Sequence, residues 1–166
     1  MAMRPSGQDR PRRSRFERIT TRLAHIGFLL QRPMTLGVRG IVIDGAGAVL
    51  LVKHSYVAGW HLPGGGVEPG ETCETALARE IREEANVVVE PPTLLHGLFF
   101  NANISRRDHV AVYVIRRFRS LGEHEPDREI LEARFFPSEA LPEDTTRATR
   151  ARLAEVFEGR PAAALW

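Results

Sequence analysis

The sequence has almost no cysteine and no long apolar run, and each shortage excludes a class of protein. Cys73 is the only cysteine in 166 residues, so an internal disulfide framework cannot form. A chain without disulfides fits a reducing compartment, and we expect the cytoplasm. The longer apolar runs, residues 49–52 and 110–115, fall far short of the roughly 20 residues that cross a bilayer. The sequence therefore predicts no transmembrane segment, while its 43% hydrophobic content predicts a folded core.

Lysine is also nearly absent, and the basic charge is unevenly distributed. Lys53 is the only lysine, so 22 of the 23 basic residues are arginine. We interpret this first as coding bias and second as phosphate recognition. Residues 1–32 carry eight arginines against two acidic residues, a net charge of +6, which leaves −4 on the remaining 134 residues. The basic character belongs to the N-terminal part, so we do not expect nucleic acid as the main partner.

Composition divides the chain into three parts. Residues 1–13 are polar, basic and interrupted by proline and glycine, so we expect a disordered arm. Residues 14–32 repeat apolar side chains at three- and four-residue steps, which predicts an amphipathic helix. Its role stays open between packing on the main domain or a second subunit, binding a membrane surface or nucleic acid, and organellar targeting. The length of the remainder, residues 33–160, predicts a single domain.

Residues 33–160 have the pattern of a mixed α/β domain. We expect the strand at residues 36–44 to pair with residues 48–53 as a hairpin. Further strands are predicted at residues 87–89, 93–100, 109–119 and 133–136, and helices at residues 73–85 and 145–158. Strands in the middle, with helices between and after them, predict a mixed sheet covered by helices on both faces, an α/β (α+β) fold.

One stretch, residues 61–89, joins a glycine loop, PGGG at residues 63–66, to an acidic helix. Thr72 is a suitable N-cap, and Asn86 suits a left-handed C-cap. On this helix Glu80 and Glu84 lie one turn apart on the same face, and Glu83 flanks them.

This crowding of carboxylates has two interpretations. The first is a solvated acidic face in which Arg79 and Arg82 relieve the repulsion. The second is a site for a hard cation such as Mg²⁺ or Mn²⁺, which takes oxygen ligands. Glycine lets the backbone approach a metal or phosphate without a Cβ in the way. The loop and the helix together are therefore typical of a phosphate–metal site.

The same stretch resembles a known family motif. From Gly65 the sequence reads glycine, five residues, Glu71, seven residues and then REIREEANV at residues 79–87. This resembles the Nudix box, G-x5-E-x7-R-E-U-x-E-E-x-G-U with U aliphatic. Asn86 replaces the last glycine of the motif, and asparagine tolerates a positive φ. Residues 36–53, WHLPGGG at 60–66 and EARFFPSEAL at 132–141 extend the resemblance, which implies a Nudix-type α/β/α sandwich with a mixed β-sheet between helices.

The resemblance implies particular roles for the residues of the box. The implied metal ligands are the carbonyl of Gly64 and the carboxylates of Glu80, Glu83 and Glu84, with Mg²⁺ as the cofactor and Mn²⁺ as its alternative. Arg79 is expected to orient these glutamates by ion pairing. Glu71 is expected to brace the loop against the helix or to hold a metal through water. We expect Glu83 to be the general base and Glu129 to be the second candidate.

Residues around the box are candidates for substrate binding. The candidates are Arg39, Trp60, Gly65, Gly66 and Arg106. A structural role is the alternative for each of the three side chains: a strand position for Arg39, core packing for Trp60 and a solvated turn for Arg106. His54 and Tyr56 precede the glycine loop, where a nucleobase would stack.

The implied function is divalent-metal-dependent hydrolysis of the pyrophosphate linkage in a nucleoside diphosphate derivative, of nucleotide or nucleotide-sugar type. Residues 97–103 lack the proline of many ADP-ribose-cleaving members. They also lack the tyrosine that members acting on dinucleoside polyphosphates often have nearby. Nucleoside triphosphates, ADP-ribose-like compounds and RNA 5′ ends all stay open as substrates. The alternative is a non-catalytic nucleotide-binding or regulatory domain. We expect a homodimer because many members of the family are dimers.

Overall fold

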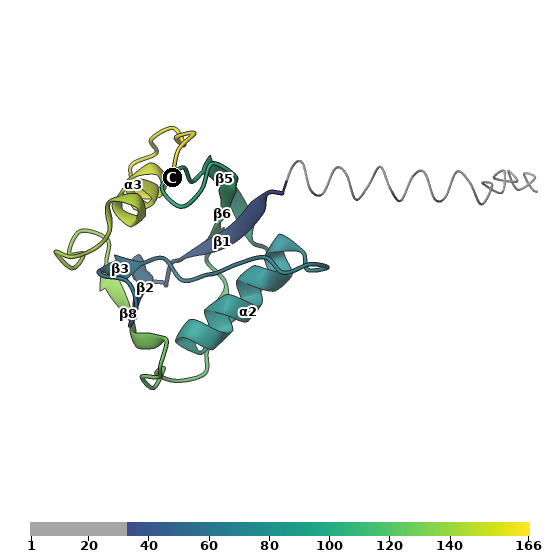
Figure 1. Ribbon diagram of the computed structural model, residues 1–166. Coiled ribbons are helices and arrows are strands. Elements are labelled where there is room, and N and C mark those ends of the chain that lie inside the picture. The colour runs from purple at the N-terminus through teal and green to yellow at the C-terminus, as the bar shows by residue number, and fades with distance from the viewer. Residues whose placement is uncertain (1–32) are drawn as a thin grey trace, which may run out of the picture. The chain divides into compact units, whose positions relative to one another are not determined.

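The computed structural model describes residues 33–166 (Figure 1). The predicted arm, residues 1–13, and the predicted amphipathic helix, residues 14–32, lie outside the described residues. Within the described part, no helix has the length and apolar character that a membrane crossing requires. The strands are β1 Thr35–Val42, β2 Ala48–His54, β3 Trp60–His61, β4 Val87–Val89, β5 Leu94–Phe100, β6 Asp108–Ile115, β7 Phe118–Ser120 and β8 Ile130–Pro137; the helices are α2 Cys73–Ala85 and α3 Arg147–Phe157.

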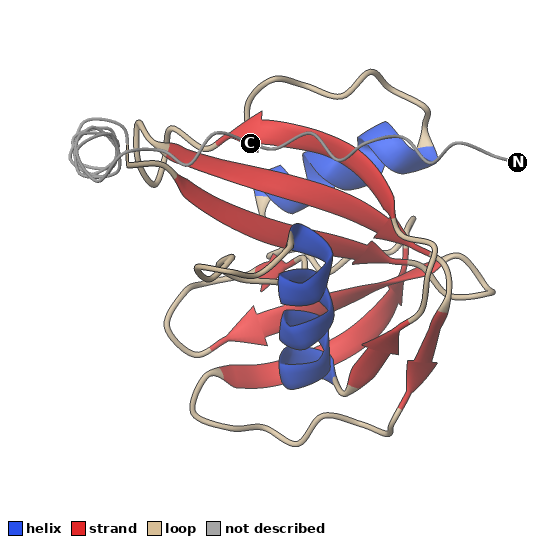
Figure 2. Cartoon of the chain, turned by 90° about the vertical axis from the view of Figure 1, so that its right-hand side faces the viewer, coloured by secondary structure: helices blue, strands red, loops and turns tan. Residues whose placement is uncertain are grey.

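The strands form a mixed set of pairings (Figure 2). Strand β6 lies between β1, to which it runs parallel, and β5, to which it runs antiparallel. Strand β2 lies between β3 and β8, both antiparallel to it. The short strands β4 and β7 pair with each other. The predicted strand at residues 109–119 is in fact two, β6 and β7, which belong to different sheets.

The predicted hairpin between β1 and β2 is wrong. The two strands share a single isolated bridge, Ile43 to Val49, among the described residues. One edge of β1 pairs with β6 along its whole length. The other edge is occupied by the glycine loop, where Val38 N–H donates to Gly65 O at 2.8 Å and Gly40 N–H donates to Pro63 O at 2.9 Å. Strand β1 therefore positions the glycine loop directly.

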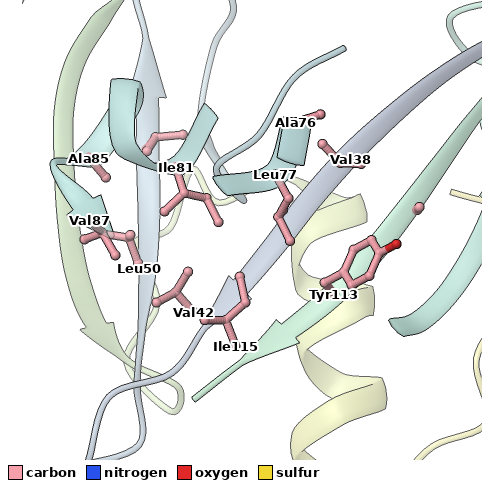
Figure 3. Close-up of a cluster of buried hydrophobic side chains, with 12 residues drawn as sticks. Val38, Val42, Leu50, Ala76, Leu77, Ile81, Ala85, Val87, Tyr113 and Ile115 are labelled. Atoms are coloured by element: carbon pink, nitrogen blue, oxygen red, sulfur yellow. The ribbon is translucent and has the colours of Figure 1, made fainter. Parts of the chain in front are cut away.

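Helix α2 packs on one side of the strands (Figure 3). Its capping is as predicted, because Thr72 Oγ1 accepts a hydrogen bond from Thr75 N and Asn86 has the left-handed φ of 53°. The apolar side of the helix is fully or nearly buried: Ala76, Leu77, Ile81 and Ala85. It packs against alternate residues of three strands, namely Val38 and Val42 of β1, Leu50 and Val52 of β2, and Ala111, Tyr113 and Ile115 of β6.

The other residues of the same strands form a second buried cluster. Ile41, Val49, Leu51 and Val112 pack there with Leu153 of α3. Because side chains of a strand alternate between its two faces, α2 and α3 cover opposite faces. This confirms the predicted mixed α/β fold with strands between helices.

The last helix, α3, buries charged side chains as well as apolar ones. Its buried residues are Thr149, Arg152, Leu153 and Glu155. Arg152 Nη2 and Glu155 Oε1 form a buried ion pair at 2.6 Å. A count of apolar residues cannot identify this pair, because paired charges can be buried when their polar atoms are hydrogen-bonded.

Candidate active site

Gly64 and Gly65 of the glycine loop lie where a side chain would clash. Gly64 has φ +135°, and a Cβ at this residue would lie 2.2 Å from the carbonyl oxygen of Val38. A Cβ on Gly65 would lie 2.5 Å from the carboxylate of Glu80. Glycine therefore brings the loop backbone against β1 on one side and against the acidic helix on the other.

Glu84 is the buried carboxylate of the site, at 6% exposed. Its Oε2 accepts a hydrogen bond from Gly64 N at 2.7 Å, and its Oε1 lies 3.8 Å from His54 Nε2. Burial raises the pKa of Glu84 to about 7, against the opposing effects of Arg39 and the Gly64 N–H; the charges of Glu80 and Glu129 add to the rise. A buried carboxylate with other carboxylates around it is a place where a cation binds favourably.

Arg79 connects the other acidic residues. Its guanidinium bonds both oxygens of Glu71, at 3.0 and 3.1 Å, and donates to Glu80 Oε1 at 2.7 Å. It also donates to Gly66 O at 3.2 Å and reaches Glu83 Oε2 at 3.4 Å. The bonds to Glu71 and Glu80 raise the pKa of Arg79, and the bond from Arg79 lowers the pKa of Glu71. The ion pairs expected of Arg79 and Glu71 are thus present, and they tie the loop to α2.

Arg39 extends from β1 to the carbonyl side of the glycine loop. Its Nη1 donates to Gly64 O and, at 3.3 Å, to Leu62 O. The Gly64 carbonyl, an expected metal ligand, therefore already faces a cation. Burial lowers the pKa of His54 to about 4, with further lowering from Arg39 and His61, so this neighbouring imidazole is neutral at pH 7.

The backbone of Glu129 is held next to the end of β2. Asp127 Oδ1 accepts hydrogen bonds from Glu129 N and Ile130 N, both at 2.7 Å, and the Glu129 carbonyl accepts one from Ser55 N at 2.9 Å. These bonds fix the start of β8 next to the end of β2. Burial raises the pKa of Tyr56, and the negative charges of Glu129 and Glu84 raise it further.

The donor set fits a hard divalent cation. Gly64 O and the carboxylates of Glu80 and Glu84 supply only oxygen, which Mg²⁺ and Mn²⁺ prefer. The raised pKa of Glu84 and the guanidinium at Gly64 O both mark a place that favours positive charge. In the described residues no three acidic, histidine or cysteine side chains converge on one point. Glu83 in particular has a 62% exposed side chain that pairs with Arg79.

Two adjoining cavities lead away from the glycine loop. The smaller, about 290 Å³, is lined by Gly65 and Gly66, and the larger, about 490 Å³, by His54, Tyr56 and Thr149 of α3. Both cavities are lined by four shared residues: Arg39, Asn101, Ile104 and Trp166. We call the two cavities together the cleft. Its combined size suits a small-molecule ligand.

Two expected substrate residues do not line this cleft. Trp60 is 5% exposed and packs edge-on against Phe136 at 4.7 Å, which is the core packing given above as its alternative role. Arg106 is exposed on the loop before β6 and lines neither cavity. Arg39, Gly65 and Gly66 do line the cleft.

No local sequence signal indicated Asn101 or Trp166 as site residues. Both are distant from the glycine loop along the chain and reach the cleft only through the tertiary fold. A larger cavity, about 660 Å³, lies elsewhere, between β8 and the residues around His124. It contains none of the residues of the acidic helix face, so it is not the candidate active site.

Comparison with known proteins identifies the family. The model of the NUDIX domain matches residues 33–157. The 8-oxo-dGDP phosphatase of Homo sapiens is 32% identical over 121 residues, covering 68% of this chain and 35% of that protein. The ADP-ribose pyrophosphatase of Methanocaldococcus jannaschii is 34% identical over 104 residues, covering 61% of each chain. The crystal structure of a MutT NUDIX hydrolase from Burkholderia pseudomallei superposes with a TM-score of 0.63 at 28% identity, covering 74% of this chain and 98% of that chain.

The chain therefore belongs to the Nudix family. It spans about a third of the length of its human relative and about three fifths of its archaeal relative. The names of these relatives describe activities on different nucleotide derivatives.

Proposed function

We propose that this chain is a divalent-metal-dependent hydrolase that cleaves the pyrophosphate linkage of a nucleoside diphosphate derivative. This proposal rests on the hydrogen bond from Gly64 N to Glu84 Oε2, at 2.7 Å, which lies beside a cleft lined by Arg39. Gly64 O, Glu80 and Glu84 would hold Mg²⁺, or Mn²⁺ in its place, and Glu83 would join them on turning away from Arg79. When bound, such an ion neutralises phosphate oxygens and lowers the pKa of a water molecule.

The protein groups have separate tasks in this proposal. Arg79 holds Glu80 and Glu71 in fixed positions, so that α2 presents its carboxylates to the loop. Arg39 leaves the Gly64 carbonyl and pairs with a phosphate oxygen of the substrate, which is a favourable charge-assisted contact. Gly65 and Gly66 leave room for the phosphates to approach the backbone.

A carboxylate near the proposed metal site removes the proton from the attacking water. Both candidates, Glu83 and Glu129, stay in the proposal, but we now place Glu129 first. Glu129 shares its surroundings with Glu84 and Tyr56, whereas Glu83 lies on the exposed side of Arg79. A general base has to reach the water that it deprotonates.

The names of the relatives support a nucleotide substrate. They include an 8-oxo-dGDP phosphatase and an ADP-ribose pyrophosphatase. We propose a nucleoside diphosphate derivative, with RNA 5′ ends as the alternative substrate that the arginine-rich residues 1–32 favour. A non-catalytic role has less support, because the carboxylates of the motif are present and ordered by Arg79. A homodimer and a cytoplasmic location are part of the same proposal and rest on the family resemblance and the single cysteine.

A substrate panel tests the proposal. The protein is incubated with nucleoside triphosphates, 8-oxo-dGDP, ADP-ribose and a 5′-triphosphorylated RNA, each with Mg²⁺ and each with a chelator, and phosphate and nucleotide products are measured. We expect product release from at least one nucleotide. This release should require Mg²⁺ and should fall at least about 100-fold in Glu129→Gln, the usual loss for a general base. Release that is equal with the chelator, or absent from the whole panel, contradicts the proposal.

A further inference from the structure

The segment at residues 160–166 lies beyond the part of the chain that matches the family domain, residues 33–157, yet it is built into the fold. It runs beside the end of β5, where Phe100 N donates to Ala164 O at 3.0 Å and Trp166 N donates to Phe100 O at 3.1 Å. Figure 1 shows this end of the chain beside α3 and β5. We call residues 160–166 the added segment because they lie beyond the family match, and they form part of the rim of the cleft.

A buried polar network holds this segment in place. Arg152 Nη1 donates to Leu165 O at 2.8 Å, and Glu155 Oε1 accepts from Ala163 N at 3.0 Å. The same two side chains pair with each other at 2.6 Å, and His96 Nε2 lies 2.8 Å from Glu155 Oε2. Burial of charges is unfavourable unless they are paired and hydrogen-bonded. These two charges are satisfied partly by the backbone of the added segment, which shows that α3 is built to hold it.

The network places Trp166 at the junction of the two cavities of the cleft. Its indole packs edge-on against Phe99, with 6.1 Å between ring centroids, and lies 5.8 Å from the Arg152 guanidinium. The side chain is half-buried and lines both cavities. One part of the ring is thus fixed by the core while the remainder faces the cleft.

Asn101 provides a polar group at the same junction. Its Nδ2 donates to Asp108 Oδ2 at 2.8 Å, and because a carboxylate only accepts, this bond fixes the orientation of the amide. Asn101 Oδ1 is buried and has no hydrogen-bond partner among residues 33–166. A buried acceptor without a partner favours a ligand that brings an N–H group to it.

We propose that Trp166 and Asn101 form the subsite for the base of the substrate, and that the added segment is a specificity element of this chain. The ligand class is a nucleotide whose planar base stacks on Trp166 and presents an N–H donor to Asn101. This inference rests on the proposed function. Stacking on an aromatic ring suits any base, and the acceptor selects among bases by their donors.

Tryptophan fluorescence tests the contact directly. The sequence has two tryptophans, so Trp60→Phe leaves Trp166 as the only one. With Mg²⁺ present, the probe is guanosine 5′-(α,β-methylene)diphosphate, whose carbon bridge resists hydrolysis, and the matched base-free probe is methylenediphosphonate. We expect the nucleotide to change the emission of Trp166 and the diphosphonate to bind in competition without that change. The same change with both probes, or no change with the nucleotide, overturns the inference.

Kinetics separates this inference from the proposed function. For the nucleotide that the wild type hydrolyses fastest, Trp166→Ala is expected to raise KM roughly 10-fold with little change in kcat, as for the loss of one base–aromatic stack. Trp166→Phe is expected to restore most of the affinity, and Leu165→Ala, which removes an exposed side chain of the same segment, is expected to leave KM unchanged. Unchanged KM in Trp166→Ala with an active wild type overturns this inference alone. An inactive wild type overturns both.

Discussion

Replacement of Glu84 by glutamine is expected to stabilise the metal-free protein at high pH. Burial raises the pKa of this carboxyl from its ordinary value of 4.5 to about 7. Below the lower value both the folded and the unfolded chain hold the proton. As the pH rises, the unfolded chain loses its proton first, so the folded state becomes less stable until the pH passes the folded pKa. The difference between the two pKa values corresponds to about 3 kcal/mol.

Glutamine has nearly the same shape and cannot ionise, so Glu84→Gln keeps the acceptor for Gly64 N–H and removes this penalty. Urea unfolding is monitored by circular dichroism with a chelator present, at several pH values between about pH 5 and pH 8. It measures the difference in unfolding free energy between the variant and the wild type. We expect the variant to gain up to about 3 kcal/mol at the alkaline end and much less at the acid end. A difference that is independent of pH, or a variant that is less stable at the alkaline end, refutes the reasoning.

Glu83→Gln is the matched control. It removes a neighbouring carboxylate of the same helix whose side chain is 62% exposed. We expect its unfolding free energy to stay within about 0.5 kcal/mol of the wild type at both ends of the pH range.

Three further substitutions test other parts of the site. Gly65→Ala places a methyl group on the Glu80 carboxylate, so we expect Mg²⁺ affinity, measured by titration calorimetry, to fall at least about tenfold. Arg79→Lys breaks the two-point contact with Glu71, and we expect kcat/KM to fall about 10- to 100-fold in a steady-state assay because a single ammonium cannot replace the fork. Asn86→Ala keeps the length of α2 but forces alanine into a left-handed conformation, and thermal unfolding should show a loss of about 1–2 kcal/mol; Asn86→Gly should lose less. A variant that behaves as the wild type in its assay contradicts the assigned contact.

Local sequence signals predicted the acidic helix correctly in detail. The cap at Thr72, the extent of α2 and the left-handed conformation of Asn86 all depend on neighbouring residues, which the sequence displays directly. The ion pairs of Arg79 followed from the resemblance to the Nudix box and are present. The glycine at the end of the box is replaced here by a residue that adds a contact, because Asn86 Nδ2 donates to Glu123 O at 3.0 Å.

Features that depend on distant partners were predicted less well. The turn between β1 and β2 suggested a hairpin, but β6 and the glycine loop occupy both edges of β1. The position of Trp60 before the loop left substrate binding and core packing both open, and the structure shows it buried against Phe136.

The same limit explains the cleft. Asn101 and Trp166 are brought together with Arg39 by strand pairing and by the network of α3. A periodic pattern of apolar residues contains no information about such a meeting of polar groups. Burial of Arg152 and Glu155 in α3 escaped prediction for the same reason, because their partners come from the added segment.

The proposed function requires the glycine loop and α2 to hold a divalent cation between Gly64, Glu80 and Glu84. Electron paramagnetic resonance of Mn²⁺ titrated into the wild type and into a Glu80→Gln/Glu84→Gln double variant measures this binding without any substrate. We expect saturable binding of Mn²⁺ by the wild type, competition by Mg²⁺, and loss of that binding in a double variant that still folds. Equal Mn²⁺ binding by the two folded proteins would show that Glu80 and Glu84 do not hold the cation.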